Sequence, residues 1–302
     1  MKVAVAAEVE ADEPRVAATP ETIKKIIALG AEVAVELGAG VKSGVLDADY
    51  TAAGASVTAD ALNGADIVLK VRRPQAAELS RYKRGTIVIG IMDPYGHDDA
   101  LRAIADAGLT AFAMELLPRI TRAQAMDVLS SQANLAGYRA VIDAAAEYGR
   151  ALPMMMTAAG TVPATKVFVM GAGVAGLQAI ATARRLGAVV TATDVRPAVK
   201  EQVESLGAKF LAVERGGNVE GARPGEVADV GGIKIVGYTN VAGRVAASAS
   251  SLYARNLFSF IETLIDKSTK ALAVKWDDEL VKATALTRDG AVIHPNFQPK
   301  SA

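Results

Sequence analysis

The stretch KVFVMGAGVAGLQAI at residues 166–180 places three glycines between an apolar, strand-like run and an alanine-rich, helix-like run. Gly171, Gly173 and Gly176 have the spacing G-x-G-x-x-G. In a strand–turn–helix unit the first glycine permits a tight turn, and the second lets the backbone approach a pyrophosphate. The third glycine allows the helix to pack closely on the strand, and the helix start presents amides and a positive dipole end to the phosphates. The pattern predicts a dinucleotide site, and its alternative is a merely structural turn.

A carboxylate follows at the distance that such a site requires. The strand-like run AVVTATD ends at Asp194, about 20 residues after the glycines, where an acid binds the adenosine ribose. Its charge would repel a 2′-phosphate, so we expect NAD(H) rather than NADP(H). Arg196 leaves two alternatives open, because it could bind that phosphate or be a solvated arginine at a helix start. The remaining predicted cofactor-binding residues of this region are Val174, Ala175 and Val195.

The composition excludes several other classes of protein. The chain has 302 residues, of which 51% are hydrophobic, so we expect about two domains with a sizeable core. Lys plus Arg and Asp plus Glu both number 33, so no net charge attracts nucleic acid. The absence of cysteine excludes disulfides and zinc–thiolate sites. With only His97 and His294, a histidine metal site is not expected either.

Two apolar regions could be mistaken for targeting or membrane segments. At the N-terminus, Glu8 and Glu10 interrupt the apolar run before it reaches the length of a signal-peptide core. Residues 151–183 are apolar overall, but Pro153, Lys166 and the glycines break them. We therefore expect no signal peptide and no membrane span.

The elements around the glycine turn predict two Rossmann-like α/β domains with parallel sheets. Strand-like runs such as KVAVAAE and TIVIGIM alternate with helix-like runs that close at Gly30 and Gly108. Such alternation implies crossover connections. We predict a discontinuous first α/β domain from residues 1–128 plus 245–302, and an NAD-binding Rossmann domain over residues 138–237.

Long helices should join these domains, with the cofactor in a cleft between them. The helical pattern at residues 122–149 is predicted to be the linking helix. The methionines at residues 154–156 are interpreted as flexible core filling. After the strand-like run at residues 209–213, the chain enters a polar, glycine-rich stretch instead of a further helix and strands. The predicted nucleotide domain is therefore shortened, with half of the usual sheet absent.

Three long motifs resemble one family, namely PRITRAQAMDVLSSQANLAGYRAV, PMMMTAAGTVPATKVFVMGAGVAGLQAIATARRLGAVVTATDVRP and KIVGYTN. They are similar to the NAD(H)-binding component, domain I of the alpha subunit, of proton-translocating nicotinamide nucleotide transhydrogenase. The resemblance covers Met1 to about Val213 and about Gly216 to Pro295. Between these blocks the family carries a further helix, two strands and a covering loop, which amount to roughly sixty or more residues.

The resemblance implies roles for residues that composition alone would not single out. It implies that Arg119, Asp127 and Ser130 orient the nicotinamide and that Gln124 meets the partner nucleotide, with Tyr138 nearby on the same helix. The structural alternative is a surface ion pair between Arg119 and Asp127, with Ser130 as a helix cap. Hydride transfer between two nicotinamides needs near-contact alignment and no general base, which agrees with these residue types.

The resemblance also implies an activity and its partners. The chain would transfer hydride between NADH and NADP⁺ bound on a partner subunit, coupled to proton translocation. Its partners would be a second copy of the chain in a homodimer, an NADP(H)-binding component and a membrane-spanning proton-channel component. The implied location is cytoplasmic, peripheral at the inner face of the cytoplasmic membrane.

Two alternatives remain at the level of the sequence. Alanine dehydrogenase shares the opening EPRVAATP with Arg15, but Arg72 occupies the position of its lysine, and Lys70 and His97 are displaced from its lysine and histidine. An amino-acid oxidoreductase must move a proton and needs such groups. The third alternative, a noncatalytic NAD-binding module, applies if the shortened nucleotide domain is genuine.

Overall fold

The computed structural model describes residues 1–212 and 221–298. The chain forms two compact units: the first comprises Met1–Ser131 with Ala246–Ala302, and the second comprises Gln132–Val245. One boundary falls within helix α4 (Val128–Tyr148), and the other falls at the start of helix α7 (Ala246–Leu264). Both units are α/β, as the sequence predicts. No helix in the described ranges is long and apolar enough to cross a bilayer.

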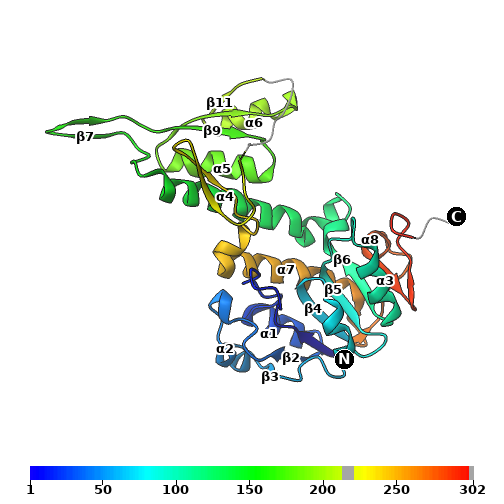
Figure 1. The fold of residues 1–302 in the computed structure, drawn as a ribbon. Coiled ribbons are helices and arrows are strands. Elements are labelled where there is room, and N and C mark those ends of the chain that lie inside the picture. Colours follow the sequence, from blue (N-terminus) through cyan, green and yellow to red (C-terminus); the bar gives the residue numbers. More distant parts are fainter. Residues whose placement is uncertain (213–220, 299–302) are drawn as a thin grey trace. The chain divides into compact units, whose positions relative to one another are not determined.

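The first unit is built on a six-stranded parallel sheet in the order β3-β2-β1-β4-β5-β6 (Figure 1). Its strands are β1 (Lys2–Val5), β2 (Glu32–Glu36), β3 (Ser56–Thr58), β4 (Ile67–Arg72), β5 (Ile87–Ile91) and β6 (Thr110–Ala113). Its helices are α1 (Pro20–Ala28), α2 (Asp47–Ala52), α3 (Asp98–Asp106), α7 and α8 (Glu279–Thr284). The 3₁₀ segments include η2 (Ala76–Arg81) and η4 (Thr121–Met126), and two short hairpins, β14–β15 (Ile265–Asp266, Ala271–Leu272) and β16–β17 (Thr287–Arg288, Ala291–Val292), follow α7.

The alternation of side chains along each strand divides the core of this unit into two layers. On β1, Val3 and Val5 pack in one layer with apolar residues of α1 and α7, whereas Ala4 packs in the other with residues of α3. A sheet covered on both faces explains why its strands are apolar throughout. Gly30 and Gly108 follow α1 and α3 with φ of +92° and +73°, as the sequence predicts for helix-ending glycines.

The second unit has a smaller parallel sheet in the order β11-β10-β9. Its strands are β9 (Lys166–Met170), β10 (Val189–Thr193) and β11 (Lys209–Phe210), connected by α5 (Val174–Arg185) and α6 (Lys200–Ser205). Helix α4 and the hairpin β7–β8 (Met155–Thr157, Gly160–Val162) precede the sheet. The order is that of the first half of a doubly wound nucleotide fold, in which strand 1 would pair on its other side with strand 4.

The helix predicted over residues 122–149 begins later than expected. Residues 121–126 form the 3₁₀ segment η4, and α4 starts at Val128. Asp127 separates the two with φ −70° and ψ 92°, and its Oδ1 accepts a hydrogen bond from the Ser130 amide at 2.9 Å. Asp127 thus caps α4, and an aspartate preceding an apolar helical run is the signal that the prediction overlooked.

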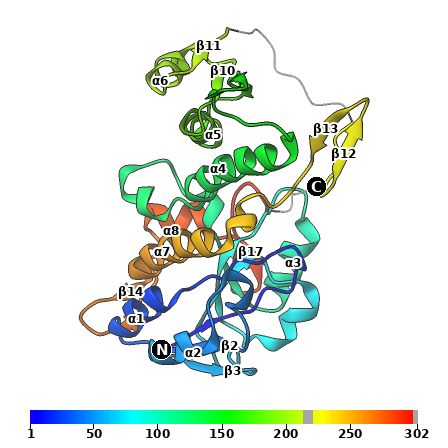
Figure 2. The same cartoon turned by 90° about the vertical axis from the view of Figure 1, so that its left-hand side faces the viewer.

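The glycine-rich stretch after residue 220 contains a hairpin that the sequence interpretation missed. Strands β12 (Val227–Val230) and β13 (Ile233–Val236) pair in antiparallel fashion around Gly231 and Gly232 (Figure 2). Both glycines have positive φ, +61° and +81°, which a two-residue type I′ turn requires. The Lys234 Nζ lies 2.9 Å from Glu147 Oε2 on α4. The first part of the predicted glycine-rich stretch, residues 213–220, lies outside the described residues.

The methionines of residues 154–156 are not core residues. Met154, Met155 and Met156 are 61%, 44% and 76% exposed on and beside the β7–β8 hairpin. The hairpin extends away from the three-stranded sheet in Figure 1, and all six of its strand residues are exposed. The interpretation as core filling was wrong because a short antiparallel hairpin outside the sheet has no second layer to cover it.

Candidate functional site

The three glycines of the turn between β9 and α5 meet three different steric demands. Gly171 has φ +96°, which allows the chain to turn sharply at the end of β9. A Cβ on Gly176 would lie 1.7 Å from the Gly171 carbonyl oxygen, so only glycine fits there. Gly173, at the N-cap of α5, faces open space, with nothing within 4 Å of a Cβ built on it. The turn is therefore closed on its protein side and open where a phosphate would approach.

Asp194 is tied directly to this turn. It follows β10, is 8% exposed, and its Oδ2 accepts a hydrogen bond from the Ala172 amide at 2.7 Å. Arg196 forms a bidentate pair with the same carboxylate, with Nε–Oδ1 2.9 Å and Nη2–Oδ2 3.0 Å, and its amide donates to Oδ1. These bonds, led by the Arg196 guanidinium, hold the pKa of Asp194 well below its usual range. The carboxylate is ionised at neutral pH and suited to accept ribose hydroxyl bonds.

The pairing of Arg196 bears on its two alternatives. Its side chain is 60% exposed and paired with Asp194, and both alternatives for Arg196 stay predictions. Val195, between them, is 58% exposed beside the turn. An apolar side chain there offers a contact surface for an adenine ring.

Gly137 is a contact of the turn that the sequence interpretation missed. It lies inside α4 and is buried, and a Cβ on it would lie 2.0 Å from the Ala175 carbonyl oxygen in the first turn of α5. Nearby, Asn134 Nδ2 lies 3.3 Å from Gln178 Oε1 on α5. A glycine in a helix interior costs stability unless it permits a close approach, and this was the available signal. Tyr138, the next residue, is 40% exposed.

The residues implied to face the two nicotinamides lie between residue 119, just before η4, and residue 130, in the first turn of α4. Arg119 and Gln124 are exposed, and within the described residues neither side chain forms a hydrogen bond or ion pair. Asp127 and Ser130 contact each other, because the Ser130 amide and Oγ donate to Asp127 Oδ1 and Oδ2 at 2.9 and 2.5 Å. The alternative interpretation assigned the helix cap to Ser130, but the cap of α4 is Asp127. The Arg119–Asp127 ion pair of that interpretation is not formed among the residues that the structure describes.

This segment is held in place from its inner side. Ala123 and Met126 are buried in the core of the first unit. Asn256 of α7 donates from Nδ2 to the Ala125 carbonyl at 2.8 Å and accepts from Ser131 Oγ at 2.7 Å, so it bridges η4 and α4. The sequence offered no signal for Asn256, because its partners lie 125 residues or more away along the chain.

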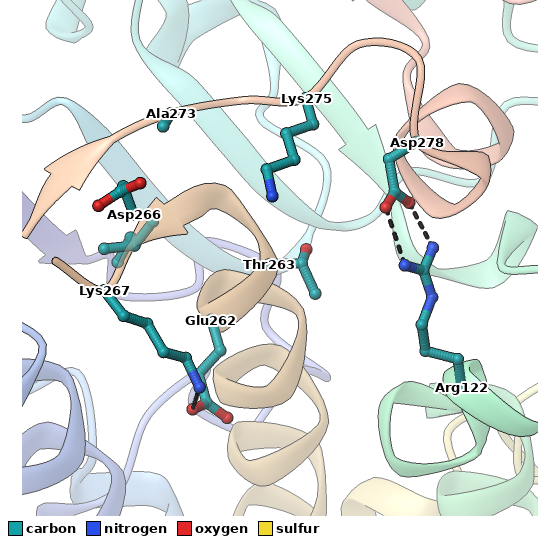
Figure 3. A pocket seen from close by; sticks show the side chains of 9 residues that line it. Arg122, Glu262, Thr263, Asp266, Lys267, Ala273, Lys275 and Asp278 are labelled. Atoms are coloured by element: carbon teal, nitrogen blue, oxygen red, sulfur yellow. Dashed lines mark hydrogen bonds and ion pairs between the residues drawn. The ribbon is translucent and has the colours of Figure 1, made fainter.

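An ion pair also joins η4 to α8. Arg122 donates through both Nη atoms to Asp278, the N-cap of α8, at 2.9 and 2.6 Å (Figure 3). The pair borders a pocket of about 300 Å³ beside the β14–β15 hairpin, where Lys267 also pairs with Glu262. Acids and bases alternate around this pocket, so it has no predominant charge to select a ligand. The pair matters because it restrains the segment that carries Arg119 and Gln124.

A second cluster of charged residues lies within the first unit. Lys70 is fully buried in β4, with Nζ 2.8 Å from Glu78 Oε1 and 3.8 Å from Glu8 Oε2. Arg15 is 4% exposed and bonded to Glu13, and Arg72 Nε reaches the same carboxylate at 2.8 Å. Burial raises the pKa of Glu8 to about 7, although Lys70 and the amides of Val71 and Arg72 oppose this.

Comparison with known proteins places this geometry in a family. Residues 4–136 match the N-terminal domain of alanine dehydrogenase/PNT, and residues 140–213 and 211–295 match its C-terminal domain. The chain belongs to the alanine dehydrogenase/PNT family. It is 44% identical to the first portion of the NAD(P) transhydrogenase alpha subunit of Rhodospirillum rubrum over 384 aligned positions that cover 100% of both chains. The crystal structure of transhydrogenase from Sinorhizobium meliloti is 56% identical, with a TM-score of 0.91 over 98% of this chain and 100% of that chain.

The alanine dehydrogenase branch of the family is more distant. Alanine dehydrogenase of Mycobacterium tuberculosis is 33% identical over 216 positions, which cover 70% of this chain and 57% of that protein. The predicted resemblance to transhydrogenase and the relation to alanine dehydrogenase are both confirmed. Within this alanine dehydrogenase/PNT chain, Lys70 and Arg15 are engaged in buried ion pairs, and His97 Nδ1 lies 2.9 Å from the Asp93 carbonyl oxygen. Lys70 and Arg15 are therefore both occupied by buried carboxylates.

Gly137→Ala provides a test of the contact between α4 and the turn. By helix propensity alone, alanine would stabilise α4 by about 1 kcal/mol. Because its Cβ would collide with the Ala175 carbonyl, we expect instead a lower thermal unfolding midpoint and weaker dinucleotide binding. Calorimetric unfolding and nucleotide titration measure both. A variant that is stabilised and binds unchanged would show that the close approach is not a constraint.

Glu8→Gln tests the buried charge cluster. The folded-state pKa of Glu8, about 7, lies above its ordinary value of 4.5, so its contribution to stability is full below pH 4.5 and is lost as the pH rises through 7. Relative to the variant, the unmutated chain should therefore lose on the order of 3 kcal/mol of unfolding free energy across this range. Urea denaturation at a series of pH values measures the difference. Parallel stability curves would contradict it.

Proposed function

We propose that the chain is the NAD(H)-binding subunit of a proton-translocating transhydrogenase, which transfers hydride between NADH and NADP⁺ held by a partner subunit. The observation that carries the proposal is the state of Arg119 and Gln124. Neither side chain has a partner in the part of the chain that the structure describes, yet the adjoining segment η4 is held by Asn256 and by the Arg122–Asp278 pair. Groups that must orient a ligand need such a fixed support, and this backbone supplies it.

The chemistry needs only binding and orientation from this chain. The glycine turn would hold the pyrophosphate, with amides of Val174 and Ala175 at the positive end of α5, and Asp194 would bind the adenosine ribose. The bound dinucleotide supplies the hydride. Arg119, Asp127 and Ser130 would orient the nicotinamide, and Gln124 would meet the partner's nucleotide. Hydride transfer between two rings in near contact requires no proton acceptor from the protein.

The assembly follows from the same proposal. The partners would be an NADP(H)-binding component and a membrane-spanning proton-channel component, and the chain would lie in the cytoplasm at the inner face of the cytoplasmic membrane. A homodimer is supported by the exposed methionines of the β7–β8 hairpin, since exposed apolar surface of this kind marks interfaces. We also propose that the two units correspond to the domains predicted from residues 1–128 plus 245–302 and 138–237.

One observation favours a second candidate function. The sheet β11-β10-β9 is only the first half of a nucleotide fold, which serves the adenosine side of a dinucleotide. A chain with that half alone could bind NAD(H) and not position the nicotinamide for transfer. A noncatalytic NAD-binding module is therefore the alternative, and hydride-transfer assays separate it from the first proposal.

Gln124→Asn tests the catalytic assignment. Removing one methylene withdraws the amide by about 1 Å, which can cost on the order of a hundredfold in rate, whereas binding at the glycine turn changes little. We expect a large loss of single-turnover hydride transfer in the presence of an NADP(H)-binding component, with at most several-fold change in the NADH dissociation constant. Gln202→Asn, at an exposed position of α6, is the matched control and should leave both values unchanged. An unmutated chain that binds NADH without transferring hydride would favour the noncatalytic module.

Asp194→Ala tests cofactor choice. The unmutated chain should bind NADH more tightly than NADPH, because the Asp194 carboxylate accepts ribose hydroxyls and repels a 2′-phosphate. The variant should lose roughly tenfold or more in NADH affinity and release Arg196, so its affinity for NADPH should be maintained or increased. Isothermal titration with each nucleotide measures the change. Equal binding of both nucleotides by the unmutated chain would disprove the assignment.

A further inference from the structure

Strand β9 ends the sheet of the second unit on a side where a nucleotide fold would continue. It pairs with β10 from Lys166 to Met170, and no described strand pairs with its other edge (Figure 1). That edge borders a groove of about 430 Å³. The opposite wall of the groove is α4, which contributes Ala140, Ala144 and Tyr148. The small side chains of this helix leave room along the strand.

One face of the same sheet is also uncovered. The register pairs Phe168 with Thr191 and Thr191 with Lys209, so alternate residues of the three strands share a face. On this face Phe168 and Met170 are 51% and 61% exposed, and Val189, of the same parity on β10, is 52% exposed. The other face packs on α5 and α6 through residues such as Val169 and Val190. Parallel sheets are normally covered on both faces, so this one lacks a layer.

The comparison with relatives indicates the length and the position of a segment that this chain lacks. The alignment with the Rhodospirillum rubrum protein spans 384 positions and includes all of this 302-residue chain, so about 80 of its positions have no counterpart here. The C-terminal family domain matches in two pieces that meet at residues 211–213, directly after β11. In a doubly wound fold the chain leaves strand 3, crosses the sheet and adds strand 4 beside strand 1. Strand 1 here is β9.

We propose that the β9 edge and the bare face form an acceptor surface for a strand–helix segment of another polypeptide. The occupant would add a strand parallel to β9 along the α4 groove and lay an amphipathic helix over Phe168, Met170 and Val189. Backbone hydrogen bonds to the β9 edge supply affinity, and burial of the three apolar side chains supplies selectivity for an apolar helix face. The surface thus takes in trans the kind of segment that relatives carry in cis. The proposal involves no nucleotide and does not depend on the proposed function.

The test is binding of that segment to the full chain. The probe is the stretch of the Rhodospirillum rubrum relative that aligns between the two pieces of the C-terminal family match, added without nucleotide. We expect a 1:1 complex by sedimentation, a thermal unfolding midpoint raised by several degrees, and slower amide exchange within residues 166–170. Failure of the segment to bind, or binding without protection of β9, would overturn the proposal.

Substitutions locate the binding surface. Phe168→Asp places a charge at the centre of the bare face and should weaken binding at least about tenfold. Val230→Asp is the matched control, because Val230 is similarly exposed, 48%, on the β12–β13 hairpin, and it should bind the segment as the unmutated chain does. Unchanged circular dichroism verifies that both variants fold. If the chain alone forms a dimer that Phe168→Asp dissociates, the surface takes a second copy of the chain, and the proposal is wrong.

Discussion

The second unit depends on two contacts in which backbone meets backbone without an intervening side chain. Gly176 approaches the Gly171 carbonyl, and Gly137 approaches the Ala175 carbonyl, at distances that exclude even a methyl group. These contacts bring β9, α5 and α4 together at one turn. A main-chain contact closes the turn at Gly176, whereas a Cβ on Gly173 would meet nothing within 4 Å. The bond from the Ala172 amide to Asp194 then joins β10 to the same point.

The first unit is organised by a different constraint, the pairing of polar groups inside an apolar sheet. Buried Lys70 pairs with Glu78 at 2.8 Å and has Glu8 at 3.8 Å, and the Tyr253 hydroxyl of α7 donates to the Lys70 carbonyl at 2.9 Å. The same helix carries Asn256, which bonds to the backbone of η4. Thus α7 connects the interior of the sheet to the segment that carries the proposed nicotinamide-orienting residues. The backbone of that segment is therefore held in place, while the exposed Gln124 side chain has no partner among the described residues.

The sequence was informative wherever a local rule determines the structure. The alternation of strand and helix, the glycine ends of α1 and α3, and the steric pattern of GAGVAG follow from residues close in sequence. The predicted helix start was wrong because Asp127 caps α4. The prediction for residues 154–156 was wrong because no layer covers the hairpin that carries these exposed methionines. Asn256 could not have been found, because its role depends on packing between distant segments. The family resemblance alone implied roles for Arg119, Gln124, Asp127 and Ser130. The structure shows that Asp127 and Ser130 bond to each other, and it gives the other two side chains no partner among the described residues.

Under the proposed function, the elements of this chain that bind the nucleotide differ from those that would orient it for hydride transfer. The proposed adenosine side of the site would use β9, β10 and the start of α5, and these elements are joined by the β9–β10 pairing and by the bond from the Ala172 amide to Asp194. In a doubly wound fold, the strands beyond strand 1 build the nicotinamide side. Here they would begin at the β9 edge, which has no described neighbouring strand. Under the proposed function, the residues proposed to anchor the dinucleotide therefore all lie in this unit. If the proposed function is right, the residues that orient the nicotinamide lie outside this sheet, because the sheet has no described strand beyond β9.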